Sequence, residues 1–393
     1  MKRRLLFLSL LPVLLLVAWL ALFLKSGGLY TSLQLGSRAL GFEVSTPEDA
    51  NSPLTVAAGF KVAPYYNAIP GPRGLAYSPA GLIVSSPSEG GVYRLIDSNH
   101  DGRAEDHLAI VDKLSRPTGL AIHNNWLYIA ETDAIGRIAY NPLSGATQGS
   151  YERIIQNLPS GGNHWRRVIH FGPDNWLYLA IGSSCNICIE EDSRRATIMR
   201  FHADGSSGEI VATGLRNSAG FDWAPWNNQL YATDNGRDWL GDDEPPDELN
   251  HITHGSFYGW PFSNGFGKTD PDYGNHPSKP QQPAKQPVHG FRPHNASLGI
   301  LFNRSSQLPV DYQRSAFVAL HGSWNRTTPD GYKVVSLHWT NNGNIVEKDL
   351  LTGFLTPRGK VLGRPAELAQ DENGSLYISD DHADTLYRLF PTH

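Results

Sequence analysis

The chain has 393 residues, of which 39 are glycine, 27 are proline and 40% are hydrophobic. This composition is typical of a turn-rich all-β protein with enough apolar side chains to form a core. The formal net charge of −5 is mild and no basic stripe interleaves with aromatic residues, so nucleic acid is not expected as a partner.

The first predicted element is a membrane-spanning helix. Basic residues at 2–4 precede an apolar run over 5–24, and Lys25 follows it. A run of about 20 apolar residues covers the hydrocarbon core of a bilayer. A cleaved signal peptide usually has a shorter apolar region that ends in a small-x-small site, and this run has no such ending. We therefore expect residues 1–25 to be an uncleaved anchor in the inner membrane, with the rest of the chain on the periplasmic side.

Residues 26–51 have no strong periodicity and are interpreted as a stalk. From residue 52 onward one sequence pattern recurs: an alternating apolar stretch, a Gly/Asn/Asp turn, and a second strand. Its six copies begin near Gly74, Gly119, Val168, Gly220, Gly299 and Glu367. A repeat of about 40–50 residues built from strands and tight turns is typical of a propeller blade. The pattern predicts an all-β, six-bladed β-propeller over 52–393, closed by a strand near 59–63 that pairs with the last blade.

The spacing of the copies widens between Gly220 and Gly299. The added segment, 258–287, is rich in proline, glycine and asparagine. Long irregular segments in compact folds are usually functional, so this one is a candidate lid or specificity loop.

The two cysteines, Cys185 and Cys188, form one C-x-x-C motif. A single pair cannot supply the four ligands of a structural zinc site. A thioredoxin-type redox pair would need a βαβ context, which is missing here. We expect a disulfide that pins a loop in an oxidising compartment.

The loop from Asp97 to Asp106 opens like a calcium loop, with the pattern D-x-N-x-D-G. Leu108 stands where an EF-hand has its bidentate glutamate, and no helices flank the loop. It is therefore either a structural calcium turn at a hairpin tip or a polar turn.

Two polar motifs lie just ahead of predicted inner strands. His164 is in the sequence GGNHWRR, and histidine is the side chain best suited to proton transfer near neutral pH. Arg216 and Asn217, in GLRN, can recognise a planar anionic ligand rich in carbonyls. The alternatives are a structural hydrogen-bonding histidine and an arginine that links two blades.

Charged residues cluster in two further places. The acidic run over 234–248 would repel itself unless solvated or neutralised by a cation, and calcium accepts carboxylate and carbonyl oxygens. Arg326, Lys333 and Arg364 come from late blades and, with Arg216, would make an electropositive channel mouth suited to a polyanion. Individually, each could instead be a surface or blade-linking charge.

These motifs, in this order over about 53–390, resemble the glucose/sorbosone dehydrogenase family, and its sorbosone dehydrogenase branch in particular. Its members are soluble-type quinoproteins that use pyrroloquinoline quinone (PQQ). The motifs that carry the resemblance are GGNH (161–164), GLRN (214–217), the DNG…DELN…YGWP run (234–261), HGSWNR…GYKVV (321–335), GRP (363–365) and DDHADTLYRL (380–389).

The resemblance implies a six-bladed propeller with PQQ over the channel mouth. His164 then corresponds to the catalytic histidine, and Asp247 to an acidic residue that supports the histidine or the metal loop. The carbonyls of Gly236 and Arg237 correspond to ligands of Ca²⁺. The residues implied to contact the cofactor are Arg216, Asn217, Arg326, Lys333 and Arg364.

Two positions depart from the family pattern. Asn163 precedes the histidine where some relatives have aspartate, and Ser183 follows Gly182 where some have aspartate. We therefore expect the carboxylate that orients His164 to come from elsewhere, with Asp247 as the candidate.

The sequence predicts a membrane-anchored, PQQ- and Ca²⁺-dependent dehydrogenase that oxidises an aldose or related sugar, with His164 as general base. A separate acceptor, a quinone or a cytochrome, would receive the electrons. One alternative is a calcium-dependent propeller hydrolase of the lactonase type, which would need inward carboxylate ligands from several blades. The other is a binding propeller without catalysis, which the departures at Asn163 and Ser183 leave open.

Overall fold

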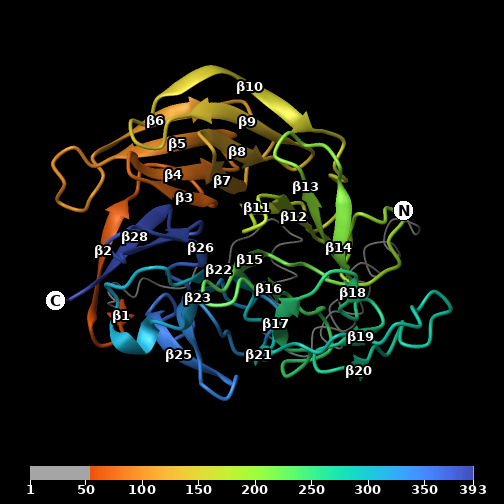
Figure 1. Cartoon of the computed structure of the whole chain (residues 1–393). Coiled ribbons are helices and arrows are strands. Elements are labelled where there is room, and N and C mark those ends of the chain that lie inside the picture. Colours follow the sequence, from red (N-terminus) through yellow and green to blue (C-terminus); the bar gives the residue numbers. More distant parts are fainter. Residues whose placement is uncertain (1–53, 393) are drawn as a thin grey trace, which may run out of the picture.

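The computed structural model describes residues 54–392, which form six main sheets arranged as wedges around a central axis (Figure 1). Each wedge is built on four antiparallel strands, as the repeat predicts, and in four of the six blades these strands follow one another directly in the chain. The six-bladed propeller inferred from the sequence is therefore confirmed.

The four strands of each blade take equivalent positions from the axis outward. The innermost strands are β3 (Leu75–Ser78), β7 (Gly119–His123), β11 (Arg167–Phe171), β15 (Gly220–Trp223), β22 (Ser297–Phe302) and β26 (Pro365–Gln370). The second strands are β4 (Gly81–Ser86), β8 (Trp126–Ala130), β12 (Leu177–Ile181), β16 (Leu230–Asp234), β23 (Ser315–Leu320) and β27 (Leu376–Asp380). The third strands are β5 (Gly91–Ile96), β9 (Ile135–Tyr140), β13 (Thr197–Phe201), β17 (Asp247–Ile252), β24 (Lys333–Trp339) and β28 (Thr385–Pro391). The outermost strands are β6 (Asp106–Val111), β10 (Thr147–Ile155), β14 (Glu209–Thr213), β21 (His289–Phe291), β25 (Ile345–Thr352) and β2 (Phe60–Tyr66).

The second strands are the most deeply buried. Every residue of β12, β16, β23 and β27 is buried, because each lies in the middle of its blade with a neighbouring blade packed on both faces. A strand covered on both faces is apolar along nearly its whole length rather than alternating. This explains the Leu-Tyr pairs that mark the second strand of each repeat in the sequence.

The core consists of six apolar clusters, and each fills the interface between two neighbouring blades. The cluster between the fifth and sixth blades, for example, contains Phe317, Leu350, Leu376 and Leu389. The innermost strands contact one another in a closed ring from β3 through β26 and back to β3. The hydrophobic stabilisation is thus shared by all six interfaces.

The ring is closed by strand pairing between the two ends of the described chain. Strand β2 runs antiparallel to β28, from the pair Phe60 and Pro391 to the pair Tyr66 and Leu386. The last blade therefore takes its outermost strand from the N-terminal side of the domain, as predicted. A further short strand, β1 (Thr55–Val56), extends the fifth blade by pairing with β25.

The long segment between β17 and β21, the third and outermost strands of the fourth blade, lies at the side of the propeller (Figure 1). Its strand β18 (Ser256–Phe257) pairs in parallel with β14, and β19 (Ser263–Asn264) and β20 (Lys268–Thr269) form a short hairpin. Over residues 54–392 the one helical element is a 3₁₀ turn at Val310–Tyr312, and no helix has the length and apolar character that a membrane crossing requires. The predicted anchor at 5–24 and the stalk at 26–51 lie outside the described residues and stay predictions.

Ring closure can be tested by truncating Leu389, which is fully buried on β28. We expect Leu389→Ala to lower the free energy of unfolding by about 2–5 kcal/mol, because it opens a cavity between the fifth and sixth blades. Leu143→Ala is the control, since Leu143 is 76% exposed, and its cost should stay within about 0.5 kcal/mol. Equal effects of the two changes in denaturant melts would contradict the packing described here.

Candidate active site

A pocket lies on the propeller axis, at the end where the chain enters each innermost strand. Because strand direction alternates, the connections ahead of the innermost strands and those after the second strands reach this same end. All six blades contribute to the pocket, through residues that include Arg73, Thr118, His164, Asn217, Leu298 and Glu367. The predicted His164 and Asn217 are therefore brought together, and Asn163 lines the same pocket.

His164 is held in one tautomer by Ser183. Its Nδ1 lies 2.9 Å from the carbonyl oxygen of Ser183 and 2.9 Å from the Oγ of the same residue. A carbonyl can only accept a hydrogen bond, and the hydroxyl of Ser183 donates its own proton to the carbonyl of Cys185, 2.7 Å away. Nδ1 must therefore carry the proton, which leaves Nε2 with a lone pair that can accept one.

The electrostatic surroundings keep His164 neutral. Removal from solvent, and then the positive charge of Arg216, lower the pKa of His164 to about 3. The imidazole is thus unprotonated at neutral pH. Gly182 makes the close approach possible, because a Cβ there would lie 2.6 Å from the Cβ of His164 and 2.7 Å from the Oδ1 of Asn217.

Asp247 does not orient His164, and that part of the sequence prediction is wrong. Its Oδ1 accepts a hydrogen bond from the amide of Gly236 at 2.9 Å, and its Oδ2 accepts one from the amide of Ala296 at 2.7 Å. The carboxylate therefore anchors the Gly236 loop, which is the second role that the sequence allowed. Asp247 begins β17 in the fourth blade, whereas Ser183 lies two residues after the end of β12, in the blade of His164.

Arg216 is buried and bound by the loop that contains both cysteines. Its guanidinium donates to the carbonyl and side-chain oxygens of Asn186, at 3.0 and 2.8 Å, and forms an ion pair with Asp238 at 3.1 Å. Cys185 and Cys188 form the predicted disulfide across Asn186. Because Asn186 also accepts a hydrogen bond from the amide of Asp238 at 2.8 Å, this loop ties Arg216 to the acidic run.

Gly236 and Arg237 can provide backbone oxygens, but not side chains, to a bound cation. A Cβ on Gly236 would lie 2.8 Å from the ring of Pro245, so the site has no room for a side chain. The side chain of Arg237 is buried in ion pairs with Asp270 at 2.8 Å and Asp272 at 2.9 Å. The inserted segment thus neutralises Arg237 and leaves its carbonyl as the group available to a metal.

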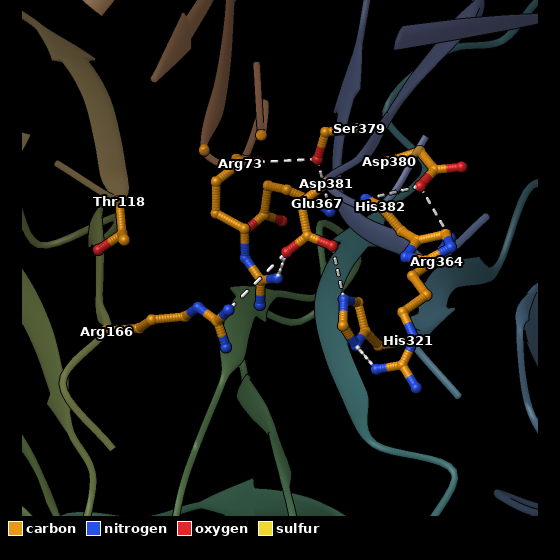
Figure 2. A network of polar contacts seen from close by, with 12 residues as sticks. Arg73, Thr118, Arg166, His321, Arg364, Glu367, Ser379, Asp380, Asp381 and His382 are labelled. Carbon is orange, nitrogen blue, oxygen red and sulfur yellow. Dashed lines mark hydrogen bonds and ion pairs between the residues drawn. The ribbon is translucent and has the colours of Figure 1, made fainter. Parts of the chain in front are cut away.

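A polar network centred on Asp381 lies at the pocket mouth (Figure 2). Asp381 forms ion pairs with Arg73 and, at 3.8 Å, with Arg166, and its Oδ1 accepts a hydrogen bond from the Nε2 of His321 at 2.7 Å. The Nη1 of Arg364 lies 3.4 Å from the Nδ1 of His321. Burial would raise the pKa of Asp381, but the charges of Arg73 and Arg166 and the hydrogen bond from His321 hold it well below its usual range.

The other two predicted cations lie apart from this network. Arg326 is buried and donates to the carbonyls of Asp242 and Pro293. Lys333 begins β24, and its Nζ lies 2.6 Å from the Oδ1 of Asp349 on the outermost strand β25. The structure does not bring Lys333 to the axial pocket, because strand pairing directs it toward the rim of its blade.

Sequence reasoning missed Arg73, Asp381 and Glu367. One signal was available for Arg73, which stands just ahead of the innermost strand of the first repeat, as Arg364 does in the last. Asp381 stood inside the quoted motif DDHADTLYRL, but nothing in the pattern distinguished it from its neighbours. The role of Ser183 as a hydrogen-bond acceptor for His164 could not be read from the chain at all.

Comparison with known proteins identifies the family. The protein-family model described as "Glucose / Sorbosone dehydrogenase" matches residues 123–388. The chain belongs to this family. A protein of Borreliella burgdorferi described as uncharacterized is 32% identical over 358 residues, which are 87% of this chain and 92% of that one. A pyrroloquinoline quinone-dependent pyranose dehydrogenase of Coprinopsis cinerea is 25% identical over 84% of this chain, which spans 53% of that relative.

Solved structures share the fold. The holo PQQ domain of the Coprinopsis cinerea pyranose dehydrogenase superimposes with a TM-score of 0.70 at 22% identity, covering 88% of this chain and 100% of that one. A calcium structure of a Trichoderma reesei carbohydrate-active enzyme of family AA12 has a TM-score of 0.74 at 20% identity, covering 89% and 100% of the two chains. At these identities the likeness supports the propeller architecture and no finer conclusion.

The role of Ser183 can be tested with Ser183→Asp. A carboxylate beside Nδ1 stabilises the imidazolium, so we expect the pKa of His164 to rise from about 3. A titration of the ring nitrogens by NMR measures this change without any cofactor. Ser206→Asp adds the same charge in an exposed turn and should leave the titration of His164 unchanged. An unshifted pKa in Ser183→Asp would contradict the contact between the two residues.

Proposed function

We propose that this protein is a PQQ-dependent oxidoreductase that oxidises a sugar at a CH–OH group, with His164 as the general base. The observation that carries the proposal is the state of His164. It is neutral, its Nδ1–H is bound to Ser183, and it lies beside Asn217 in an axial pocket to which all six blades contribute. Membership of the glucose/sorbosone dehydrogenase family supports the same reaction class.

The charges at the mouth fit PQQ. Arg73 and Arg364 belong to the network around Asp381, and burial raises the pKa of Glu367 in the axial pocket to about 7, so carboxylates balance these guanidinium groups only in part. A flat ligand with three carboxylates would balance that charge. Guanidinium groups bind carboxylates through planar, bidentate hydrogen bonds. Arg364 adjoins the same network and is positioned to bind a carboxylate of PQQ. Lys333 is not, because it pairs with Asp349.

Bound PQQ would supply an electrophilic quinone carbonyl that accepts a hydride from the substrate carbon. The protein's part is to take the hydroxyl proton. Nε2 of His164 is the atom that accepts it, and Ser183 keeps the ring oriented while the imidazolium forms. Asn217 lines the pocket beside His164 and can contact the quinone edge. The guanidinium of Arg216 is held by Asn186 and Asp238, so Arg216 acts through its positive charge near His164 rather than through a free donor.

Calcium is proposed to bind the carbonyl oxygens of Gly236 and Arg237. Both residues belong to a loop fixed by Asp247, and backbone carbonyls are suitable ligands for Ca²⁺. The ion would act as a Lewis acid that polarises the quinone.

The hydrolase alternative is less well supported. Within residues 54–392, groups of three side chains that could hold a metal occur at Cys185, Cys188 and Glu190 and at Asp97, Asp101 and Glu105. The first includes the disulfide, and the second lies in the connection between β5 and β6 rather than on the axis. A propeller lactonase would need such a group in the channel. Whether the β5–β6 loop binds calcium stays a prediction.

We further propose that residues 5–24 anchor the protein in the inner membrane with the propeller in the periplasm. The support is the length of the apolar run and the basic residues ahead of it. Electrons would leave to a separate quinone or cytochrome. Sorbosone and aldoses are both proposed substrates of the site.

The proposal is tested by titrating the full-length protein with PQQ and Ca²⁺ and recording the quinone absorption before and after a panel of sugars is added. We expect one sugar class to bleach the quinone band. His164→Ala should still bind PQQ but lose about 10²- to 10⁴-fold in kcat, because the proton acceptor is gone. Full activity in His164→Ala would refute the assignment of the base, and quinone binding without turnover on any sugar would favour a binding propeller.

Chelation tests the calcium site separately. Removing Ca²⁺ from the loaded protein should abolish bleaching by sugar and lower the melting temperature, and adding Ca²⁺ back should restore both, because the stabilisation by a bound ion is lost with the ion. Asp247→Asn should weaken the response to Ca²⁺, since it removes the charge that anchors the Gly236 amide. A chelated protein that bleaches normally would exclude a catalytic calcium.

A further inference from the structure

A second hollow, of about 280 Å³, adjoins the axial pocket on the side of the first three blades. It is lined by Arg73, Ser88, Arg116, Trp165, Arg166 and Asp381, among others. Arg73, Trp165 and Arg166 line both spaces, and Trp165 directly follows His164 in the chain. The hollow is therefore continuous with the walls of the pocket that contains the proposed base.

The hollow carries excess positive charge. Three guanidinium groups line it, and Asp381, its single acidic lining residue, is already engaged by Arg73 and His321. Arg116 is exposed, and among residues 54–392 it forms no ion pair with a carboxylate. An anionic ligand would meet Arg116 without displacing a carboxylate.

The loop that presents Arg116 is fixed in place. The amide of Ser115 donates to the fully buried carboxylate of Glu131 at 2.6 Å, and the carbonyl of Ser115 accepts from the amide of Thr132 at 3.0 Å. Arg116 itself has a φ of 50°, in the left-handed region that non-glycine residues rarely adopt. A backbone held in this way loses little entropy when a ligand binds.

Trp165 adds an apolar surface between the charges. The guanidinium carbons of Arg116 and Arg166 lie 5.0 and 5.1 Å from the centre of its ring. The indole ring thus holds the two guanidinium groups close together through cation–π contacts. Guanidinium groups beside it can bind an oxyanion through two parallel hydrogen bonds.

We propose that Arg116, Trp165 and Arg166 form a subsite for a sugar that carries an anionic group, a carboxylate or a phosphate. The inference rests on the proposed function and narrows it, because it makes an acidic sugar, rather than a neutral aldose, the preferred substrate. Trp165 holds the two guanidinium groups in place, and the two arginines bind the anionic group. The hydroxyl to be oxidised is then held on the His164 side.

The first experiment needs no cofactor. Full-length protein without PQQ is titrated with D-glucuronate, D-glucose 6-phosphate and D-glucose, and binding is followed by saturation-transfer NMR. We expect one anionic sugar to bind about tenfold or more tightly than glucose, with a preference that weakens as salt screens the charges. The first two sugars distinguish a carboxylate from a phosphate. Equal binding of all three would overturn the proposal.

The matched variants are Arg116→Gln and Arg314→Gln. Arg314 is also exposed and lies 5.3 Å from the centre of a tryptophan ring, that of Trp226. It precedes β23 and Trp226 precedes β16, so both lie at the opposite end of the propeller. Arg116→Gln should abolish the preference for the anionic sugar, and Arg314→Gln should keep it. A preference unchanged in Arg116→Gln would refute the subsite.

The second experiment uses the PQQ-loaded protein. Arg116→Gln should lower the ratio of kcat/KM for the anionic sugar to that for glucose by about tenfold or more, through KM. If it weakens PQQ binding to the same extent, Arg116 belongs to the cofactor site and the proposal is wrong. Failure of the wild type to turn over any sugar, with the binding preference intact, would reject the proposed function and leave the subsite standing.

Discussion

Closure of the ring by β2 and β28 is the constraint on which the rest of this structure depends. With β2 in place, the last blade is complete and packs against both of its neighbours. Each innermost strand then contacts the innermost strands on either side, and the loops ahead of these strands meet at one end of the axis. The site is therefore made of residues far apart in the chain, held by a sheet architecture without an open gap.

At the mouth of the propeller, few carboxylates are available to balance the positive charge of the arginine side chains. Asp381 is shared by Arg73, Arg166 and His321, and Arg116 forms no ion pair with a carboxylate of residues 54–392. Arginine stays charged at any physiological pH, so an anion is the remaining means of compensation. Neutral His164 suits this environment, since a charged imidazolium there would add to the repulsion.

Sequence reasoning was most successful where the pattern is local. Alternating strands and Gly/Asn/Asp turns predicted six blades, and the motif around His164 predicted a side chain at the channel. It failed for the partner of His164, because Ser183 and Asp247 belong to different blades and only the packing of blades decides which one reaches the imidazole. It also failed for Lys333, whose charge is taken up by Asp349 on the neighbouring strand.

The sequence by itself determined the propeller, its closure by the first strand, the disulfide and the family, because these depend on periodicity and on motifs contiguous in the chain. Tertiary structure decided the tautomer of His164, the anchoring role of Asp247 and the hollow formed by Arg116, Trp165 and Arg166. These features depend on the directions of side chains in loops from different blades. Such directions follow from contacts between blades, which leave no periodic trace in the sequence.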